Sequence, residues 1–188
     1  MFGIDGLLYI PNYITADQHD HLVGTIDTQP WRLDLARRTQ QYGYLYEHKA
    51  KAADLSARLG DLPDWLQSLA RQMQRDGIVA ELPDQSIINE YEPGQGSGLH
   101  IDSVDHWGEV VTSLSLCSAA VMDLTRADAR VSILLEPGSL IVFRGEARHQ
   151  WKHGMARRSQ DVIEGVTLLR ARRLSITMRQ AKMTKEER

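Results

Sequence analysis

The sequence predicts an α+β fold in which a barrel or double-sheet jelly roll of short strands carries helices on one face. Apolar residues recur with helical spacing in the N-terminal third of the chain. After Pro83 the spacing changes to a period of two, and Pro-Gly turns separate several of the alternating runs. Short strands with turn signals between them are typical of barrels and jelly rolls.

The N-terminal part is expected to form one short strand and two helices. Residues 6–13 have the composition of a strand. Thr15 is expected to begin the first helix, because Gln18 follows three residues later in the capping-box relation. The second helix is expected over residues 62–73, where apolar residues follow the i, i+3, i+4, i+7 pattern, and Gly77 would end it.

The rest of the chain is expected to supply the sheets. Five stretches have strand character: residues 86–91, 110–116, 131–135, 138–143 and 173–179. The last stretch alternates strictly, so its apolar and polar residues should face opposite ways. One face would carry Leu174, Ile176 and Met178, and the other Arg173, Ser175, Thr177 and Arg179.

Composition predicts one domain spanning residues 1–188, which we expect to be monomeric and cytoplasmic. No run approaches the roughly 18–20 apolar residues of a membrane span, so no membrane partner is expected. The first residues lack a basic stretch ahead of an apolar run, which argues against a signal peptide. Cys117 is the only cysteine, so an internal disulfide is excluded.

The net charge of −3 argues against a general polycation for nucleic acid. The charge is unevenly distributed, however, because residues 144–188 carry 12 Lys and Arg against 5 Asp and Glu. This excess permits a basic face suited to phosphates or an acidic substrate. A solvated surface of mixed charge is the alternative.

Two histidines and a carboxylate are candidate metal ligands. His100 and Asp102 are two residues apart, so on a strand both would point to one face while Ile101 faces the core. A third ligand could come from His149 or His153, and the spacing does not choose between them. Two imidazoles and a carboxylate match the facial triad of non-haem Fe(II), and zinc would also accept them.

The two arginines at the ends of residues 173–179 are candidate anion ligands. Two arginines on an inward strand face are costly unless anions meet them. At about 3.3 Å per residue their Cα atoms would be roughly 20 Å apart. Arg173 and Arg179 would therefore have to lean toward each other to hold both ends of a small dicarboxylate. The alternative is an edge strand with a solvated polar face.

These motifs together resemble the AlkB-like Fe(II)/2-oxoglutarate dioxygenases over roughly residues 39–180. The motifs are NEYEPG at 89–94, HID at 100–102, SLSL at 113–116, HG at 153–154, and two arginines separated by five residues at 173 and 179. The resemblance implies a double-stranded β-helix, Fe(II), 2-oxoglutarate and O2. It implies His100, Asp102 and His153 as iron ligands and catalytic centre, and Asn89, Tyr91, Arg173 and Arg179 as the 2-oxoglutarate site. Arg173 would take the distal carboxylate.

The resemblance further implies a nucleic acid substrate and oxidative dealkylation of an alkylated base. The segments 39–44, 89–96 and 111–123 look most like the branch that hydroxylates a modified wobble uridine in tRNA, which is the alternative. Relatives that repair alkylated adenine or cytosine carry a carboxylate two residues after the metal-binding Asp. Val104 occupies that position here. A jelly roll that binds metal without catalysis is a third possibility.

Several other side chains are candidates for substrate contact. Tyr42, Tyr44 and Tyr46 would alternate onto one strand face and could stack an extruded base, or fill a sheet–helix interface. Trp107 and Trp151 flank the metal motifs and allow the same two interpretations. The pairs at 37–38 and 157–158 are arginines that could hold phosphates or be solvated.

Overall fold

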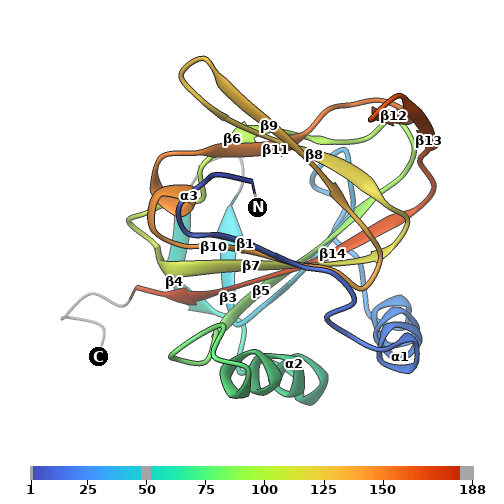
Figure 1. The fold of residues 1–188 in the computed structure, drawn as a ribbon. Helices are drawn as coiled ribbons and strands as arrows, with labels where there is room; N and C mark the ends of the chain where they lie inside the picture. The colour runs from blue at the N-terminus through green and yellow to red at the C-terminus, as the bar shows by residue number, and fades with distance from the viewer. Residues whose placement is uncertain (1, 48–51, 183–188) are drawn as a thin grey trace.

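A computed structural model describes residues 2–47 and 52–182, and it contains two antiparallel sheets that face each other (Figure 1). The larger sheet has the order β1-β10-β7-β14-β5-β2 and the smaller the order β6-β11-β8-β9. The larger sheet comprises β1 (Leu7–Ile10), β10 (Leu140–Phe143), β7 (Trp107–Cys117), β14 (Arg173–Ala181), β5 (Gln85–Tyr91) and β2 (Thr39–Tyr42). The smaller comprises β6 (Ser97–His100), β11 (Lys152–Met155), β8 (Ala120–Arg126) and β9 (Ala129–Leu135).

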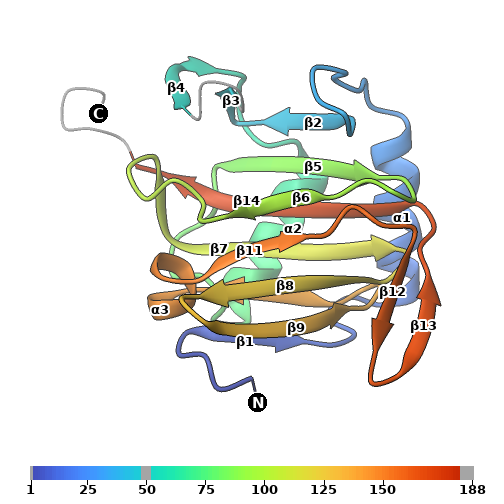
Figure 2. The same ribbon diagram turned by 90° about the horizontal axis from the view of Figure 1, so that it is seen from above.

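Two hairpins and three helices complete the described chain. The hairpins are β3 (Tyr44–Glu47) with β4 (Ala52–Arg58), and β12 (Gln160–Ile163) with β13 (Val166–Leu169). Figure 2 shows β12 and β13 projecting from one end of the sheets. The helices are α1 (Ala16–Asp27), α2 (Asp64–Arg75) and α3 (Gly145–His149). Within residues 2–47 and 52–182, no helix combines the length and apolar character needed to cross a bilayer.

Both predicted helices form, with the predicted end signals. Thr15 Oγ1 accepts a hydrogen bond from the Gln18 N–H (3.2 Å), and Gln18 Oε1 accepts one from the Thr15 N–H (2.9 Å). Gly77 has φ +70° and ends α2, where the Ile78 N–H reaches the Met73 carbonyl at 2.9 Å.

The two long helices cover one face of the larger sheet, as the sequence predicts (Figure 1). Their apolar residues share a core with the apolar face of β14, formed by Leu174, Ile176 and Met178. A second core lies between the sheets. The opposite face of β14 is thereby turned toward the interior between the two sheets, where a polar residue needs a partner.

All five predicted strands are present, and the structure adds the seven-residue strands β4 and β8 as well as several shorter ones. The strands β6, β11, β12 and β13 have four residues each, which is too short for alternation to identify them. The expectation that the three tyrosines share one strand face is wrong. Gly43 has φ +80° and separates β2 from β3, and a Cβ there would lie 1.8 Å from the Asp84 carbonyl oxygen. Tyr42 consequently packs edge-on against Trp65, with ring centroids 5.6 Å apart.

Candidate functional site

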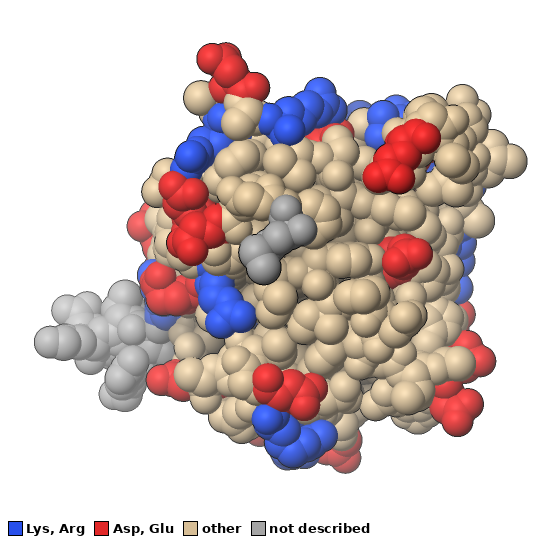
Figure 3. All heavy atoms as spheres, in the orientation of Figure 1, with Lys and Arg blue, Asp and Glu red and all other residues tan. Residues whose placement is uncertain are grey.

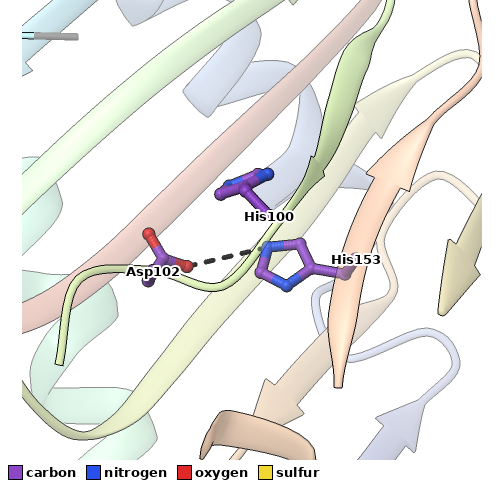
Figure 4. Close-up of side chains that lie close together, drawn as sticks. All are labelled: His100, Asp102 and His153. Atoms are coloured by element: carbon purple, nitrogen blue, oxygen red, sulfur yellow. Dashed lines mark ion pairs between the residues drawn. The ribbon is translucent and has the colours of Figure 1, made fainter. Parts of the chain in front are cut away.

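Strand pairing brings the predicted metal ligands together. Strands β6 and β11 are neighbours in the smaller sheet, and His153 lies opposite His100 in their register. Asp102 follows β6 by two residues. One ligand atom from each of the three residues lies within 4.8 Å of the other two (Figure 4). Such an arrangement leaves one side of a bound metal open.

The second candidate histidine is engaged elsewhere. His149 lies on α3, where its Nε2 is 2.8 Å from Glu109 Oε2. The expectation that Ile101 faces the core is wrong, because β6 ends at His100 and Ile101 lines a cavity instead.

The surroundings of His153 and Asp102 favour the protonation states that bind metal. Burial lowers the pKa of His153 to about 4, so its imidazole is neutral near pH 7. Burial alone would raise the pKa of Asp102, but the neighbouring positive charge, chiefly that of Arg179, outweighs it and holds that pKa below its usual value. The Phe143 ring stacks on His153 at 4.6 Å, and His100 Nδ1 is 2.9 Å from the Gly98 carbonyl oxygen. These contacts orient both rings.

The triad opens into a cavity of about 660 Å³ between the two sheets. All seven predicted site residues line it: Asn89, Tyr91, His100, Asp102, His153, Arg173 and Arg179. The predicted polar face of β14 therefore points into the cavity. The alternative of a solvated edge strand is excluded, because β14 lies between β5 and β7 in the larger sheet.

Arg173 is a buried cation that pairs with no acidic side chain of the described residues. It is 3% exposed, and burial lowers the pKa of its guanidinium to about 10. Its Nη2 donates to Ser115 Oγ at 2.8 Å, and Tyr91 lies 5.7 Å from its guanidinium carbon. Its Nε has no hydrogen-bond partner among the described residues, and none of their carboxylates pairs with it. An anionic ligand would satisfy this group.

Arg179 has a different environment. Its Nη1 forms an ion pair with Asp102 Oδ1, and its Nε donates to Gln85 Oε1 at 2.8 Å. Its guanidinium carbon lies 4.2 Å from the centre of the Trp107 ring. Arg173 reaches Ser115, which lies opposite Ser175, so its side chain extends along β14 toward Arg179. Arg179 instead contacts Gln85, its own register partner, and the carboxylate of Asp102.

Asn89 and Tyr91 lie on the strand beside the two arginines. Tyr91 is in register with Arg173, and Asn89 with Ser175. Arg37 donates from Nε to Asn89 Oδ1 at 2.8 Å and lies 5.5 Å from the Tyr91 ring centre. Arg37 lines the cavity as well, so one arginine considered for phosphates contacts the expected 2-oxoglutarate residues.

The remaining aromatic candidates divide between cavity and core. Tyr46 lines the cavity, and its ring centroid is 5.9 Å from that of Trp107. Trp107 is fully buried and Trp151 is 5% exposed. Both tryptophans are therefore core residues, and only Tyr46 of this group is placed to meet a substrate.

Part of the basic excess of the C-terminal segment lies inside the protein. Arg170 pairs with Asp161, and Arg172 with Asp27 and Glu90. Arg148, Arg173 and Arg179 are also buried. On the face shown in Figure 3, acidic and basic side chains are interspersed. The charge count of the segment therefore overstates the positive charge that is available at the surface.

The donor set fits a metal together with a small dicarboxylate. A neutral imidazole and an anionic carboxylate stand at one end of the cavity, and an unpaired guanidinium at the other. A ligand with a carboxylate at each end could coordinate the metal and reach Arg173. Sequence reasoning missed the role of Ser115 as a hydrogen-bond partner of Arg173. Ser115 lies on β7 opposite Ser175 of β14, so its contact with Arg173 depends on strand register.

Comparison with known proteins identifies the family. The profile of the 2OG-Fe(II) oxygenase superfamily matches residues 6–179. The chain belongs to this superfamily, and its relatives place it among the AlkB homologues. Fe(II) and 2-oxoglutarate are the cofactor and co-substrate that membership and the triad imply. When bound, they supply the oxidation of a C–H bond by O2, with 2-oxoglutarate converted to succinate and CO2.

Sequence relatives differ in how much of their length is matched. The chain is 36% identical over 180 residues to the uncharacterized protein L905 of Acanthamoeba polyphaga mimivirus, covering 94% of this chain and 85% of that protein. It is 33% identical over 171 residues to the tRNA (carboxymethyluridine(34)-5-O)-methyltransferase ALKBH8 of Macaca fascicularis, covering 85% of this chain. The match covers only 25% of that relative's length.

Solved structures confirm the jelly-roll fold. OsALKBH1 superimposes with a TM-score of 0.67 at 18% identity, covering 93% of this chain and 96% of the other. A prolyl-4-hydroxylase from Pseudomonas putida superimposes with a TM-score of 0.57 at 16% identity, covering 93% and 92%. At such identities the likeness extends to the fold alone.

Proposed function

We propose that this protein is an Fe(II)- and 2-oxoglutarate-dependent oxygenase that oxidises a C–H bond of a modified nucleobase. The observation that carries the proposal is that one cavity holds both the cluster of His100, Asp102 and His153 and the guanidinium of Arg173, which pairs with no carboxylate of the described residues. His100, Asp102 and His153 would hold the iron. Asn89, Tyr91 and Arg173 would hold 2-oxoglutarate, and Arg179 would orient Asp102 beside it.

Oxidative dealkylation of an alkylated base in DNA or RNA is the first candidate reaction. Hydroxylation of a carbon attached to a base nitrogen gives a product that releases an aldehyde and the bare base. The cavity is open at the metal, because His100 is exposed. An extruded base could therefore approach the metal.

Hydroxylation of a modified wobble uridine in tRNA is the second candidate, and two observations favour it. The chain is 33% identical to ALKBH8, a relative whose name refers to a carboxymethyluridine at tRNA position 34. Val104 is 41% exposed and stands where repair-type relatives carry a carboxylate.

One panel of substrates separates these candidates. The protein would be incubated with Fe(II), 2-oxoglutarate and either methylated oligonucleotides or bulk tRNA, and the nucleosides analysed by mass spectrometry. Dealkylation removes the mass of the alkyl group, whereas hydroxylation adds one oxygen atom. His100→Ala is the control for both reactions. Succinate formation unchanged in this variant would contradict the metal assignment.

A further inference from the structure

Arg148 is a buried cation whose role the site described above does not explain. It lies on α3, is 2% exposed, and forms no ion pair with a carboxylate of any described residue. A buried guanidinium without an acidic partner is costly unless its donors are satisfied.

Backbone carbonyls accept the hydrogen bonds of Arg148, and all four belong to residues 102–108. Nη1 donates to the Asp102 carbonyl at 2.7 Å, and Nη2 to those of Ser103 at 3.1 Å and Trp107 at 3.4 Å. Nε donates to the Gly108 carbonyl at 3.3 Å. Residues 101–106 join β6 to β7 outside any strand, so Asp102 and Ser103 belong to this loop, whereas Trp107 and Gly108 begin β7. Arg148 therefore ties the loop to the start of the strand that follows it.

This segment carries one of the expected metal ligands. Asp102 is thus held at two points: Arg148 binds its main-chain carbonyl, and Arg179 pairs with its side chain. The two arginines come from α3 and β14, which are far apart in sequence. The contact with Arg148 fixes the position of the Asp102 main chain, and the contact with Arg179 fixes the orientation of its carboxylate.

We infer that Arg148 is a positioning residue for the metal centre, which acts by fixing the backbone of the loop that presents Asp102. Arg148 is not itself part of the cavity lining, and it contacts the main-chain carbonyl of Asp102 rather than an expected ligand atom. The inference requires the metal site and is independent of which substrate is oxidised.

Two other interpretations of Arg148 make different predictions. If it acted only through its charge, removing a cation near the site would strengthen metal binding, because like charges repel. If it served only the stability of the fold, its loss would lower the free energy of unfolding without changing the metal affinity of the folded protein. Positioning predicts that affinity falls, by about 10- to 100-fold, as for other outer contacts of metal ligands.

The test is a Co(II) titration of the full chain without 2-oxoglutarate or nucleic acid, followed by visible absorption. Arg148→Gln should raise the Kd for Co(II) by about 10- to 100-fold and change the absorption band. Arg148→Lys keeps the charge and can reach some of the carbonyls, so it should fold and show a smaller rise.

Arg170→Gln is the matched control. Arg170 is also buried and donates to main-chain carbonyls, those of Ala156 (2.8 Å) and Gln95 (3.4 Å), and its ion pair is with Asp161. This variant should lose stability and keep its Kd for Co(II) within about threefold of the parent. A Kd unchanged or lowered in both Arg148 variants, measured on folded protein, would overturn the inference. Nucleoside analysis is a separate measurement, so a failed substrate proposal would leave this result intact.

Discussion

Replacing Arg173 should separate ligand binding from folding stability. Arg173→Met removes the charge and keeps much of the side-chain volume. An anion bound to this guanidinium would lose charge-assisted hydrogen bonds in a buried site, at a cost of about 2–5 kcal/mol. At about 1.4 kcal/mol for each tenfold change, the Kd for 2-oxoglutarate should rise by about 30- to 4,000-fold.

The stability of the ligand-free protein should change little in this variant. Arg173 donates one hydrogen bond, to Ser115, and has no carboxylate partner among the described residues. Losing that bond costs about 1 kcal/mol. Relief from burying an unpaired cation offsets the loss, so the free energy of unfolding should stay within about 1 kcal/mol of the parent.

Arg170→Met supplies the opposite pattern. Its removal leaves the buried carboxylate of Asp161 without its main partner and should lower the unfolding free energy by about 3–5 kcal/mol. Calorimetry of 2-oxoglutarate binding to the Co(II)-loaded protein, together with urea unfolding, measures both quantities. If Arg173→Met binds 2-oxoglutarate within threefold of the parent, the assigned role of Arg173 is wrong.

Three further predictions concern pH, packing and ligand choice. Burial alone would raise the pKa of Asp161, but hydrogen bonds from Arg170 and other donors hold that pKa below its usual value. The ionised carboxylate therefore stabilises the folded protein at pH values above the unfolded pKa of about 3.9. This stabilisation is lost as the pH falls through the folded pKa. The difference in unfolding free energy between parent and Asp161→Asn should therefore vanish in acid, and a constant difference would contradict the assignment. A Cβ at Gly154 would lie 2.9 Å from backbone atoms of β6. Gly154→Ala should therefore lower the free energy of unfolding by about 1–3 kcal/mol, measured by thermal unfolding. A Cβ at Gly98 would meet open space, so Gly98→Ala should cost less stability. Added metal should still raise the thermal stability of the His149→Ala variant. If this stabilisation by metal were lost, the choice of His153 as the third ligand would be contradicted.

Local pattern predicted the fold class, both long helices and the strands β1, β5, β7, β9, β10 and β14. The capping box and Gly77 marked the ends of the helices, because end signals act through hydrogen bonds within a few residues. Strict alternation in 173–179 predicted which residues face the cavity. The four-residue strands of the smaller sheet were missed, since so few residues carry no reliable period.

Residue spacing alone left open which histidine joins His100 and Asp102. The resemblance to AlkB-like enzymes implied His153, and the structure places His153 in register with His100, while His149 pairs with Glu109. The spacing also treated Arg173 and Arg179 as an equivalent pair. Their different partners, Ser115 and Asp102, lie on other segments of the chain.

The sequence by itself determined which residue types are available and which share a strand face, because side-chain direction alternates within each strand. Only the tertiary structure decided which distant residues meet. The register of β11 on β6 brings His153 next to His100 in the metal cluster. The packing of β14 places Arg179 against Asp102 and leaves Arg173 without a carboxylate partner among the described residues. The left-handed backbone at Gly43 separated Tyr42 from Tyr46. Register and backbone conformation at such points depend on packing across the whole domain, which no local pattern contains.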